Sequence, residues 1–585
     1  MSFRMFAAKF ALSWLFIVSV PAVSYAEHSV GGPGDPLRLL VAEARDDARI
    51  ILIRVKPDVL EADQTVKDWY GAHYQDLQNV MRSLLMTWTD EVAPTCAFAH
   101  TDTQTIVFSY PTCKSALPGE GDGTIGHGLR PDKASAVKLL FHESVHLVGS
   151  LDEDVADRVA LSIYRTWLTL DLNRGAHWQD LNPDNRPNER TAHASAVIDT
   201  SDFKGFFVWG GCNETPAPGQ TPSGFPCSTF LGDGGVYNSE TDTWEPVPAV
   251  PSELLSEPLE GKRAYATAVF APSSRPHELG QIWVFGGCSG DNLTCSKDFN
   301  SILSYDLDHK SWSVIRPFVL PPARSKHVAF WTGSSMFIWG GISDPQAPGR
   351  GTSRNDGWIF DGENWTETRS EHAPSPRRFQ ASVYTGQNNA NPSLNGKFIV
   401  YGGCDRENGE NCVTYLNDSA VFDLNNNQWS PPLPNVSIKA RGKSAAVWTG
   451  TSMLIWGGRD RSGALPDGAL LELGETSESS HWKIISDLNN QPRYGHTMIW
   501  TGDRVITWGG MTGYNAYVSG LSEFYLPTSS APRGEWKSKA LTSAPVTRSE
   551  NSVFWLSGSM TVWGGISEDR SYLQSGGKYF PTVSE

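Results

Sequence analysis

Residues 336–341, MFIWGG, form an apolar, strand-like run that ends on two glycines. Runs of this form occur seven times from residue 190 onward, and such self-similarity indicates an architecture built from copies of one unit. A glycine pair lets the chain leave a strand in backbone conformations that other residues resist. The other six runs are FFVWGG (206–211), IWVFGG (282–287), FIVYGG (398–403), MLIWGG (453–458), VITWGG (505–510) and MTVWGG (560–565).

Two further markers recur in the copies. An arginine followed by small and apolar residues opens each copy, and a strand ending at a tryptophan follows most of the glycine pairs. Aromatic side chains at fixed positions are suited to filling the space between packed sheets. The opening arginines are Arg190, Arg263, Arg324, Arg378, Arg441, Arg493 and Arg548, and the tryptophans are Trp244, Trp312, Trp365, Trp429, Trp482 and Trp536.

This pattern resembles the kelch repeat, as found in the central domain of galactose oxidase-like proteins. The resemblance implies an all-β, seven-bladed β-propeller, in which each blade is a four-stranded antiparallel sheet. It covers roughly residues 185–585. The repeats show no grouping of Tyr, His and Cys that suggests a copper radical site, and a propeller fold does not by itself imply an activity.

The seventh copy is incomplete, because after Gly565 the chain ends without a final tryptophan strand. The segment DLNRGAHWQDL (171–181) is similar to DLDHKSWSVI of the second copy and lies before the first one. We therefore expect the stretch around Trp178 to supply the outer strand of the seventh blade. Such closure removes the exposed edge that an open array would leave.

The composition suits a β-rich globular protein. Charged residues make up 19% and hydrophobic ones 39%, with 22 tryptophans and 55 glycines. The formal net charge of −16 argues against a nucleic-acid partner, because a phosphate backbone requires a basic face. No segment after the N-terminus has the ~20 consecutive apolar residues of a membrane span.

The first 26 residues have the form of a secretory signal peptide. Arg4 and Lys9 precede an apolar stretch, residues 10–20, and small residues at Ser24 and Ala26 favour cleavage after Ala26. We therefore expect a secreted or periplasmic protein.

Eight cysteines fit an oxidising compartment. They fall in close pairs that each bracket one loop, so we expect disulfides between neighbours, although sequence alone does not determine the pairing. Three pairs directly follow a glycine pair and would hold the loop between a blade's second and third strands, a plausible binding surface. The expected pairs are Cys96–Cys113, Cys212–Cys227, Cys288–Cys295 and Cys404–Cys412.

Residues 27–168 lack the repeat and predict a small α+β domain. RIILIRVK (49–56) reads as a strand, residues 65–88 as an amphipathic helix, and residues 95–113 as a strand pair. Residues 131–149 read as a helix ended by Gly149, and residues 152–167 as a second helix.

The first of these two helices contains HESVH, an HExxH motif. His142 and His146 are four residues apart, so both rings project from one face of the helix, as a tetrahedral zinc ion requires. Glu143 would then lie beside the open coordination position, where it can act as general base.

The segment resembles the zincin metallopeptidases, and gluzincins in particular. That resemblance implies Glu153 as third zinc ligand and Asp157 as the partner that orients a ligand histidine. The link from His146 to Glu153 is shorter than in most gluzincins. The same residues also fit a metzincin-like motif with Asp152 as the last ligand, so this alternative stays open.

These features predict an exported, zinc-dependent metallopeptidase that hydrolyses peptide bonds in a protein or peptide substrate. Its propeller would bind substrate, or a protein or glycan ligand, through its loops. The alternative is a non-catalytic, secreted kelch-propeller binding protein with a degenerate zinc domain. The expected domains are residues 1–26 (signal peptide), 27–168 (zincin-like) and 169–585 (propeller).

Overall fold

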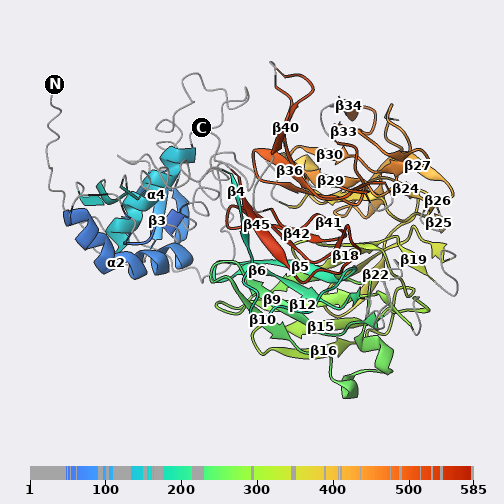
Figure 1. The fold of residues 1–585 in the computed structure, drawn as a ribbon, viewed down its shortest axis with the longest axis horizontal. Helices are drawn as coiled ribbons and strands as arrows, with labels where there is room; N and C mark the ends of the chain where they lie inside the picture. The colour runs from blue at the N-terminus through green and yellow to red at the C-terminus, as the bar shows by residue number, and fades with distance from the viewer. Residues whose placement is uncertain are drawn as a thin grey trace.

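Figure 1 shows a computed structural model of the chain. It describes most of residues 48–89, then 97–100, 105–109 and 133–148, parts of 155–163, and 176–581 apart from short gaps, the longest of which is 214–228. The expected signal peptide lies outside the described residues. Among the helices that are described, none is long and apolar enough to cross a membrane.

The N-terminal part combines helices with a small sheet. Helix α2 (Gln64–Ser83) and helix α4 (Lys133–Val148) contact each other, and α4 also contacts the sheet. The sheet has the order β1-β3-β2, with β3 parallel to β1 and antiparallel to β2. Its strands are β1 (Leu85–Thr89), β2 (Ala97–His100) and β3 (Thr105–Ser109).

Two of the predicted elements here are wrong. Ala48, Ile51 and Leu52 are helical, and the Val55 amide donates to the Ile51 carbonyl at 2.8 Å, so the described residues of the predicted strand 49–56 do not form a strand. These four residues are all buried at the spacing of one helix face, whereas a short apolar run does not by itself distinguish a strand from a buried helix. The predicted helix 65–88 ends early, because its last residues form β1.

From residue 177 onward the described chain forms seven four-stranded antiparallel sheets around a common centre (Figure 1). In each sheet the first strand is innermost, and first strands of neighbouring sheets contact one another in most blades. The strands of blades 1 to 3 are β5 (Ala194–Asp199), β6 (Lys204–Trp209), β9 (Gly234–Asn238), β10 (Thr243–Val247); β11 (Thr267–Pro272), β12 (Gly280–Phe285), β15 (Ile302–Asp306), β16 (Ser311–Ile315); β17 (Val328–Trp331), β18 (Met336–Trp339), β21 (Gly357–Phe360) and β22 (Trp365–Glu367).

Blades 4 to 7 repeat this order, and three short 3-10 helices lie in the connections: η1 (Ser252–Leu254), η2 (Pro258–Gly261) and η3 (Pro392–Leu394). The strands of blades 4 to 7 are β23 (Ala381–Tyr384), β24 (Lys397–Cys404), β27 (Tyr415–Asp423), β28 (Gln428–Trp429); β29 (Ala445–Trp448), β30 (Ser452–Trp456), β33 (Asp467–Glu472), β34 (His481–Ser486); β35 (Thr497–Trp500), β36 (Arg504–Trp508), β39 (Leu521–Tyr525), β40 (Glu535–Lys539); β42 (Ser552–Leu556), β43 (Ser559–Trp563) and β45 (Gly576–Phe580) with β4 (His177–Asp180).

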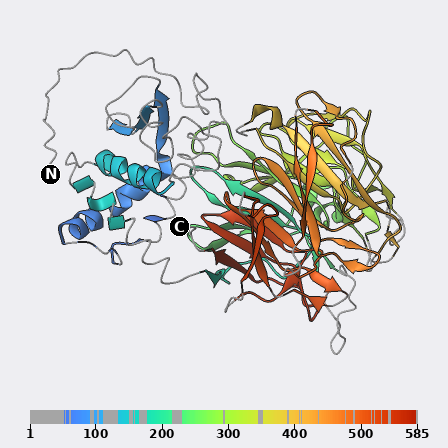
Figure 2. The same cartoon turned by 90° about the horizontal axis from the view of Figure 1, so that it is seen from above.

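The seventh blade is closed by a strand from before the first blade. Its order is β4-β45-β43-β42, and Trp178 lies opposite Tyr579 in the antiparallel register. The indole of Trp178 packs 4.8 Å from that of Trp508 and 5.4 Å from the Tyr579 ring. Both views show the last strands, in red, beside the green strands of blade 1 (Figures 1 and 2).

Aromatic side chains fill the spaces between blades. Trp209 of β6 is fully buried, and its ring lies 5.4 Å from that of Trp312 on the outer strand of blade 2. Both glycines of every repeat pair have positive φ. A Cβ on Gly211 would lie 2.4 Å from the Thr191 carbonyl oxygen, which explains why this position is glycine.

Candidate functional site

Helix α4 presents the HExxH residues from a buried support. Leu140, Phe141 and Val145 are fully buried in the N-terminal core, and the Ser144 hydroxyl donates to the Leu140 carbonyl at 2.7 Å. His142 and His146 are partly buried. Because the apolar side of the helix is anchored in the core, the two imidazoles have a fixed direction.

The two imidazoles converge. Their Nε2 atoms are 3.1 Å apart, and their ring centroids are 4.8 Å apart at an interplanar angle of 78°. Two nitrogens bound to one tetrahedral zinc at ordinary Zn–N lengths are about 3.3 Å apart. The pair therefore fits zinc, and it also fits an N–H···N hydrogen bond between two neutral rings. Glu143 between them is 6% exposed.

The structure does not describe the other predicted zinc ligands. Glu153, Asp152 and Asp157 lie outside the described residues, although the described residues around them (155–156, 158–160 and 162–163) are helical as expected. Within the described part of the chain, no group of three or more His, Cys, Asp or Glu side chains could hold a metal ion.

Strand β3 is not at an edge of its sheet. An extended substrate adds to an exposed edge strand, whereas β3 has β1 on one side and β2 on the other. Its backbone groups are therefore already used. Of the two outer strands, β2 contacts α4 more closely, so a substrate strand would have to add there.

In the propeller, the repeat arginines are structural. Each is fully or almost fully buried and donates from Nη1 to the carbonyl of the first glycine of its pair, at 2.9 to 3.4 Å. Most also donate to the backbone carbonyl just before the third strand. Four of them pair with an aspartate there: Arg190 with Asp233, Arg324 with Asp356, Arg377 with Asp418 and Arg441 with Asp467.

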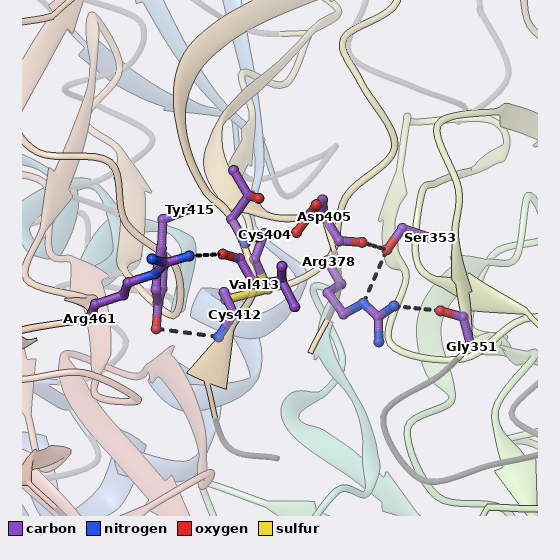
Figure 3. Close-up of a disulfide and its surroundings, with 10 residues drawn as sticks. Gly351, Ser353, Arg378, Cys404, Asp405, Cys412, Val413, Tyr415 and Arg461 are labelled. Carbon is purple, nitrogen blue, oxygen red and sulfur yellow. Dashed lines mark hydrogen bonds between the residues drawn. A yellow bond between two sulfur atoms is a disulfide. The ribbon is translucent and has the colours of Figure 1, made fainter. Parts of the chain in front are cut away.

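We expected Arg378 to be the structural arginine of the fourth copy, but Arg377 has this role. Arg378 occupies the next position, which forms a backbone bridge to the residue after the glycine pair, as Thr191 does in blade 1. Its buried guanidinium donates from Nη2 to the Gly351 carbonyl at 2.6 Å and from Nε to the Ser353 hydroxyl at 3.1 Å (Figure 3). The sequence pattern does not distinguish two adjacent arginines, whereas the backbone pairing does.

The second residue after each structural arginine has positive φ, between 51° and 62°. For residues other than glycine this conformation is strained, and such strain is found preferentially at functional sites. In four blades the amide of this residue donates to the carbonyl of its counterpart in the preceding blade, at 2.8 to 3.2 Å. These residues therefore form an arc around the propeller axis: Ala192, Tyr265, Lys326, Phe379, Lys443, Gly495 and Glu550.

Four neighbours in this arc form an alternating ladder of cations and aromatic rings. The Lys326 ammonium lies 4.9 Å from the centre of the Tyr265 ring and 5.2 Å from that of Phe379. The Lys443 ammonium lies 4.8 Å from the centre of the same Phe379 ring. All four side chains are partly exposed. We call these four residues the basic ladder.

We call the end of the propeller channel around this arc the mouth. Beyond the basic ladder, the mouth differs in charge from one side to the other. Beyond the ladder, the Arg459 guanidinium lies 4.8 Å from the centre of the Tyr494 ring. Across the axis, Glu550 accepts a hydrogen bond from the Thr191 hydroxyl at 3.2 Å. The side chains named along blades 2 to 6 are thus basic or aromatic, whereas blade 7 contributes Glu550. The hairpins around them also carry carboxylates, among them Asp405 and Asp460.

The loops between second and third strands surround the same mouth, because the residue after each glycine pair is bridged to the residue after each repeat arginine. Six of these loops form short two-stranded hairpins. They are β7 (Cys212–Asn213) with β8 (Thr229–Phe230), β13 (Cys288–Ser289) with β14 (Lys297–Asp298), β19 (Ile342–Ser343) with β20 (Thr352–Ser353), β25 (Glu407–Asn408) with β26 (Asn411–Cys412), β31 (Arg459–Asp460) with β32 (Gly463–Ala464), and β37 (Met511–Gly513) with β38 (Ala516–Tyr517).

The disulfides hold these hairpins as expected. Cys288–Cys295 and Cys404–Cys412 are formed, with Cα atoms 5.4 and 5.5 Å apart. Cys212 is also disulfide-bonded. Its expected partner Cys227 lies outside the described residues, as do Cys96 and Cys113.

Neighbouring hairpins are also joined to one another. The Ser353 hydroxyl donates to the Asp405 carbonyl, which links the loops of blades 3 and 4 (Figure 3). The Arg461 guanidinium donates to the Val413 carbonyl, which links the loops of blades 4 and 5. The surface around the basic ladder is therefore organised by contacts between blades.

The basic ladder was missed in the sequence. Along the seven copies this position holds Ala, Tyr, Lys, Phe, Lys, Gly and Glu, so the repeat pattern does not mark it. The available signal was the variation of this loop position among the copies, two residues after an arginine that every copy has.

Comparison with known proteins supports the propeller. Residues 229–390, from blade 1 to blade 4, match the KLHDC2/KLHL20/DRC7 Kelch-repeats domain. The chain is 27% identical over 257 residues to a leucine-zipper-like transcriptional regulator 1 homolog of Drosophila melanogaster, and 27% identical over 209 residues to tip elongation aberrant protein 1 of Schizosaccharomyces pombe. It is 26% identical over 263 residues to the dynein alpha chain of the flagellar outer arm of Chlamydomonas reinhardtii.

These matches are partial on both sides. They cover 39%, 34% and 42% of this chain but only 23%, 17% and 5% of the three relatives. The seven sheets, the buried arginines, the glycine pairs and the family match agree with one another. This chain contains a kelch-repeat domain folded as a seven-bladed β-propeller.

Proposed function

We propose that the propeller is a binding module that takes up an acidic segment of a partner protein at the mouth formed by the second-to-third-strand loops. The observation that carries this proposal is the basic ladder. Its two ammonium groups lie over aromatic faces at the propeller axis, in a chain whose net charge is −16. A local basic site on an acidic protein attracts acidic segments, while the acidic remainder of the surface repels them. Binding is thereby directed to the basic site.

The relatives support a binding module. The region they share with this chain occurs in a transcriptional regulator homolog, a tip elongation protein and a dynein chain. A region found in proteins of such different names is more readily explained as a binding unit than as an enzyme of one specificity.

The test is binding of fluorescent peptides measured by anisotropy, with an Asp/Glu-rich peptide and a Lys-rich peptide of equal length. We expect saturable binding of the acidic peptide only, weakened at least tenfold in a Lys326→Ala/Lys443→Ala variant and weakened by salt. Lys310→Ala is the matched control, because Lys310 is 59% exposed and pairs with Glu245 on an outer hairpin. Equal binding of both peptides, or an unchanged affinity in the double variant, would contradict the proposal.

A second candidate function is a zinc-dependent peptidase in the N-terminal part, favoured by the 3.1 Å separation of the His142 and His146 Nε2 atoms. These histidines would hold the metal together with Glu153, or with Asp152 in its place, and Asp157 would orient one of the histidines. A bound Zn²⁺ supplies an acidified water and polarises a carbonyl. Glu143, between the two histidines, would accept the proton from that water and pass it to the leaving amine.

Metal content separates this candidate from a helix with two paired histidines. Elemental mass spectrometry of the purified full chain is expected to find one zinc per chain, lost in a His142→Ala variant. Loss in Glu153→Ala with retention in Asp152→Ala would identify the third ligand. Absence of zinc after remetallation would reject the metal site. If zinc is bound but no peptide-cleaving activity is found that Glu143→Gln abolishes, only the peptidase would be rejected.

We also propose that the protein is exported. The predicted signal peptide and the disulfides at Cys288–Cys295 and Cys404–Cys412 support this, because such bonds persist in oxidising compartments. N-terminal sequencing of the protein from its native host is expected to begin at Glu27. A cytosolic protein that retains Met1 would contradict export.

A further inference from the structure

The inner strands carry a second set of aromatic residues at the opposite end of the propeller from the basic ladder. The seventh residue after each structural arginine is aromatic in six blades and Val197 in the first. Each of the seven lies opposite a fully buried residue of the second strand in the same register, so they stand at one level along the axis. The aromatic residues are Phe270, Trp331, Tyr384, Trp448, Trp500 and Trp555.

These residues, which we call the aromatic ring, keep part of their surface exposed, unlike the tryptophans of the second strands. All six aromatic side chains are partly exposed, and Val197 is 43% exposed. By contrast, Trp209, Trp339 and Trp456 of the second strands are fully buried. Five of the six aromatic residues, all except Tyr384, also pack in part against the hydrophobic clusters between blades. First strands border the central channel of a propeller, so we expect the exposed part of each ring to border that channel.

The channel next to the aromatic ring is lined by small side chains. Two residues earlier on the same strands, and on the same strand face, five blades have serine or alanine: Ser195, Ala268, Ala329, Ser382 and Ala446. These side chains are also partly exposed. In blades 6 and 7 the same position holds Met498, which is 6% exposed, and Val553. In the other five blades the small side chains leave space along the strand.

Two members of the aromatic ring are held in fixed orientation. The Trp331 ring packs edge-on against Trp283 at 5.6 Å and 73°. The Tyr384 hydroxyl donates to the Thr332 carbonyl at 3.2 Å and accepts from the Gln387 amide at 2.9 Å. Rings fixed by their neighbours offer a ligand stacking surfaces at small entropic cost.

The rim next to the aromatic ring is polar, and it is uncharged in four of the seven blades. The corresponding loops of blades 1, 2 and 6 carry charged residues: Asp202, Arg275, Glu278 and Asp503. By sequence, the loops from first to second strand in blades 3, 4, 5 and 7 contain Gly, Ser, Thr, Asn, Gln, Ala, Pro and Leu but no charged residue. Thr332 and Thr449 use their hydroxyls to shape these turns. Aromatic faces surrounded by neutral hydroxyl and amide groups match a ligand that has apolar C–H faces and a rim of hydroxyls.

We propose that this end of the channel binds a neutral oligosaccharide, with one or two hexose rings stacked on the aromatic ring. The axial C–H bonds of a hexose carry partial positive charge and meet the negative face of an indole, while its hydroxyls bond to the neutral rim. A charged peptide or a nucleic acid would find no counter-charge on the rim of these four blades. This site is separate from the basic ladder, so the inference goes beyond the proposed function.

The test is isothermal titration of the full chain with maltohexaose, cellohexaose and chitohexaose. We expect saturable binding of at least one of them, unchanged by 0.5 M NaCl because no charge is involved. Trp448→Ala and Trp500→Ala should each weaken it at least tenfold, and Trp448→Phe should restore most of the affinity. Trp482→Ala is the matched control, because Trp482 is partly exposed on the outer strand β34.

Should the alanine variants fail to fold, Ala446→Leu tests the same site by narrowing the channel beside Trp448, and it should also weaken binding. Three results would overturn the proposal: no saturable heat with any of the three sugars, equal affinity in the wild type and in both alanine variants, or binding that is abolished by salt.

Discussion

At the residue scale, the molecule depends on charged side chains buried between strands. Arg441 is 1% exposed and donates to the Gly457 carbonyl, the Asp467 carbonyl and the Asp467 carboxylate, each at 2.9 Å. One guanidinium therefore joins the end of the second strand to the start of the third. The same arrangement, with small variations, occurs in every blade.

Replacing Arg441 by methionine should destabilise the propeller by about 3 kcal/mol or more. The two carbonyls and the carboxylate would lose their donor, and buried polar groups left without a partner cost about 1–3 kcal/mol each. Urea unfolding followed by tryptophan fluorescence measures the effect. Arg275→Met is the control, since Arg275 is 78% exposed and should change stability by less than about 0.5 kcal/mol. Similar losses in both variants would contradict the structural role.

Three buried histidines make the propeller sensitive to acid. Burial, with the nearby charge of Arg324, lowers the pKa of His327 to about 3, and burial with the charge of Arg190 lowers the pKa of His193 to about 3. Burial also lowers the pKa of His496. Below the ordinary histidine pKa of 6.5 the unfolded chain binds protons that the folded chain does not, so stability falls as the pH decreases from about 6.5 toward 3.

The free energy of unfolding should therefore be lower at pH 5 than at pH 7.5, and His327→Gln should reduce this difference. The Thr267 hydroxyl, 2.7 Å from Nε2 of His327, can bond to the glutamine amide. Urea titrations at the two pH values give the difference directly. His372→Gln, at an exposed position, is the control. An unchanged pH difference in His327→Gln would show that this histidine is not protonated on unfolding.

At the element scale, the hairpins around the basic ladder need more than their own hydrogen bonds. The hairpin of β25 and β26 is only two residue pairs long, and Cys404–Cys412 spans it with a sequence separation of 8. So short a hairpin is not stable on its own. We infer that the disulfide maintains the contact of the Ser353 hydroxyl with the Asp405 carbonyl.

A Cys404→Ser/Cys412→Ser variant should lose about 2 kcal/mol of stability, as expected for a crosslink that closes a short loop. Reductant should lower the melting temperature of this variant less than that of the wild type, because this disulfide is already absent. The Cys288→Ser/Cys295→Ser variant is the matched comparison, because its loop is of similar length in blade 2. If acidic-peptide binding depends on the loops of blades 3 to 5, it should weaken in the first variant more than in the second. Equal melting temperatures for the first variant and the wild type would contradict a stabilising role.

At the scale of the whole molecule, closure of the ring depends on four residues that precede the first blade. Strand β4 covers β45, and Leu181 just after it donates its amide to the Gly576 carbonyl at 3.2 Å. Trp178 is 6% exposed and connects blades 6 and 7 through Trp508 and Tyr579. The last blade is therefore complete only when both ends of the propeller come together.

A chain that starts at residue 170 should fold to a cooperative propeller, whereas one that starts at residue 184 should unfold at lower urea concentration and aggregate. Without β4 the edge of β45 is free to pair with another chain. Analytical ultracentrifugation and urea unfolding distinguish the two. Trp178→Ala in the full chain should cost about 3–5 kcal/mol, the usual loss for a large buried aromatic side chain. Equal stability of the two shortened chains would show that β4 does not close the ring.

The sequence by itself determined the repeated part of this protein. Seven glycine-ended strands, their arginines and their tryptophans were enough to predict seven blades, and the likeness of residues 171–181 to the second copy predicted where β4 lies. Such features are periodic and local, so each copy supports the interpretation of the others. The spacing of His142 and His146 likewise predicted that their rings converge, because helix geometry alone brings residues i and i+4 together.

Only the tertiary structure decided the rest. It distinguished Arg377 from Arg378, because that choice depends on the register between strands. It made Ala48, Ile51 and Leu52 helical and placed β3 between two other strands. Apolar runs become helix or strand, and strands become edge or centre, only through their partners. It also brought Lys326 beside Phe379, and Thr332 beside Tyr384. These residues belong to different blades and become neighbours only when the sheets are arranged around one axis.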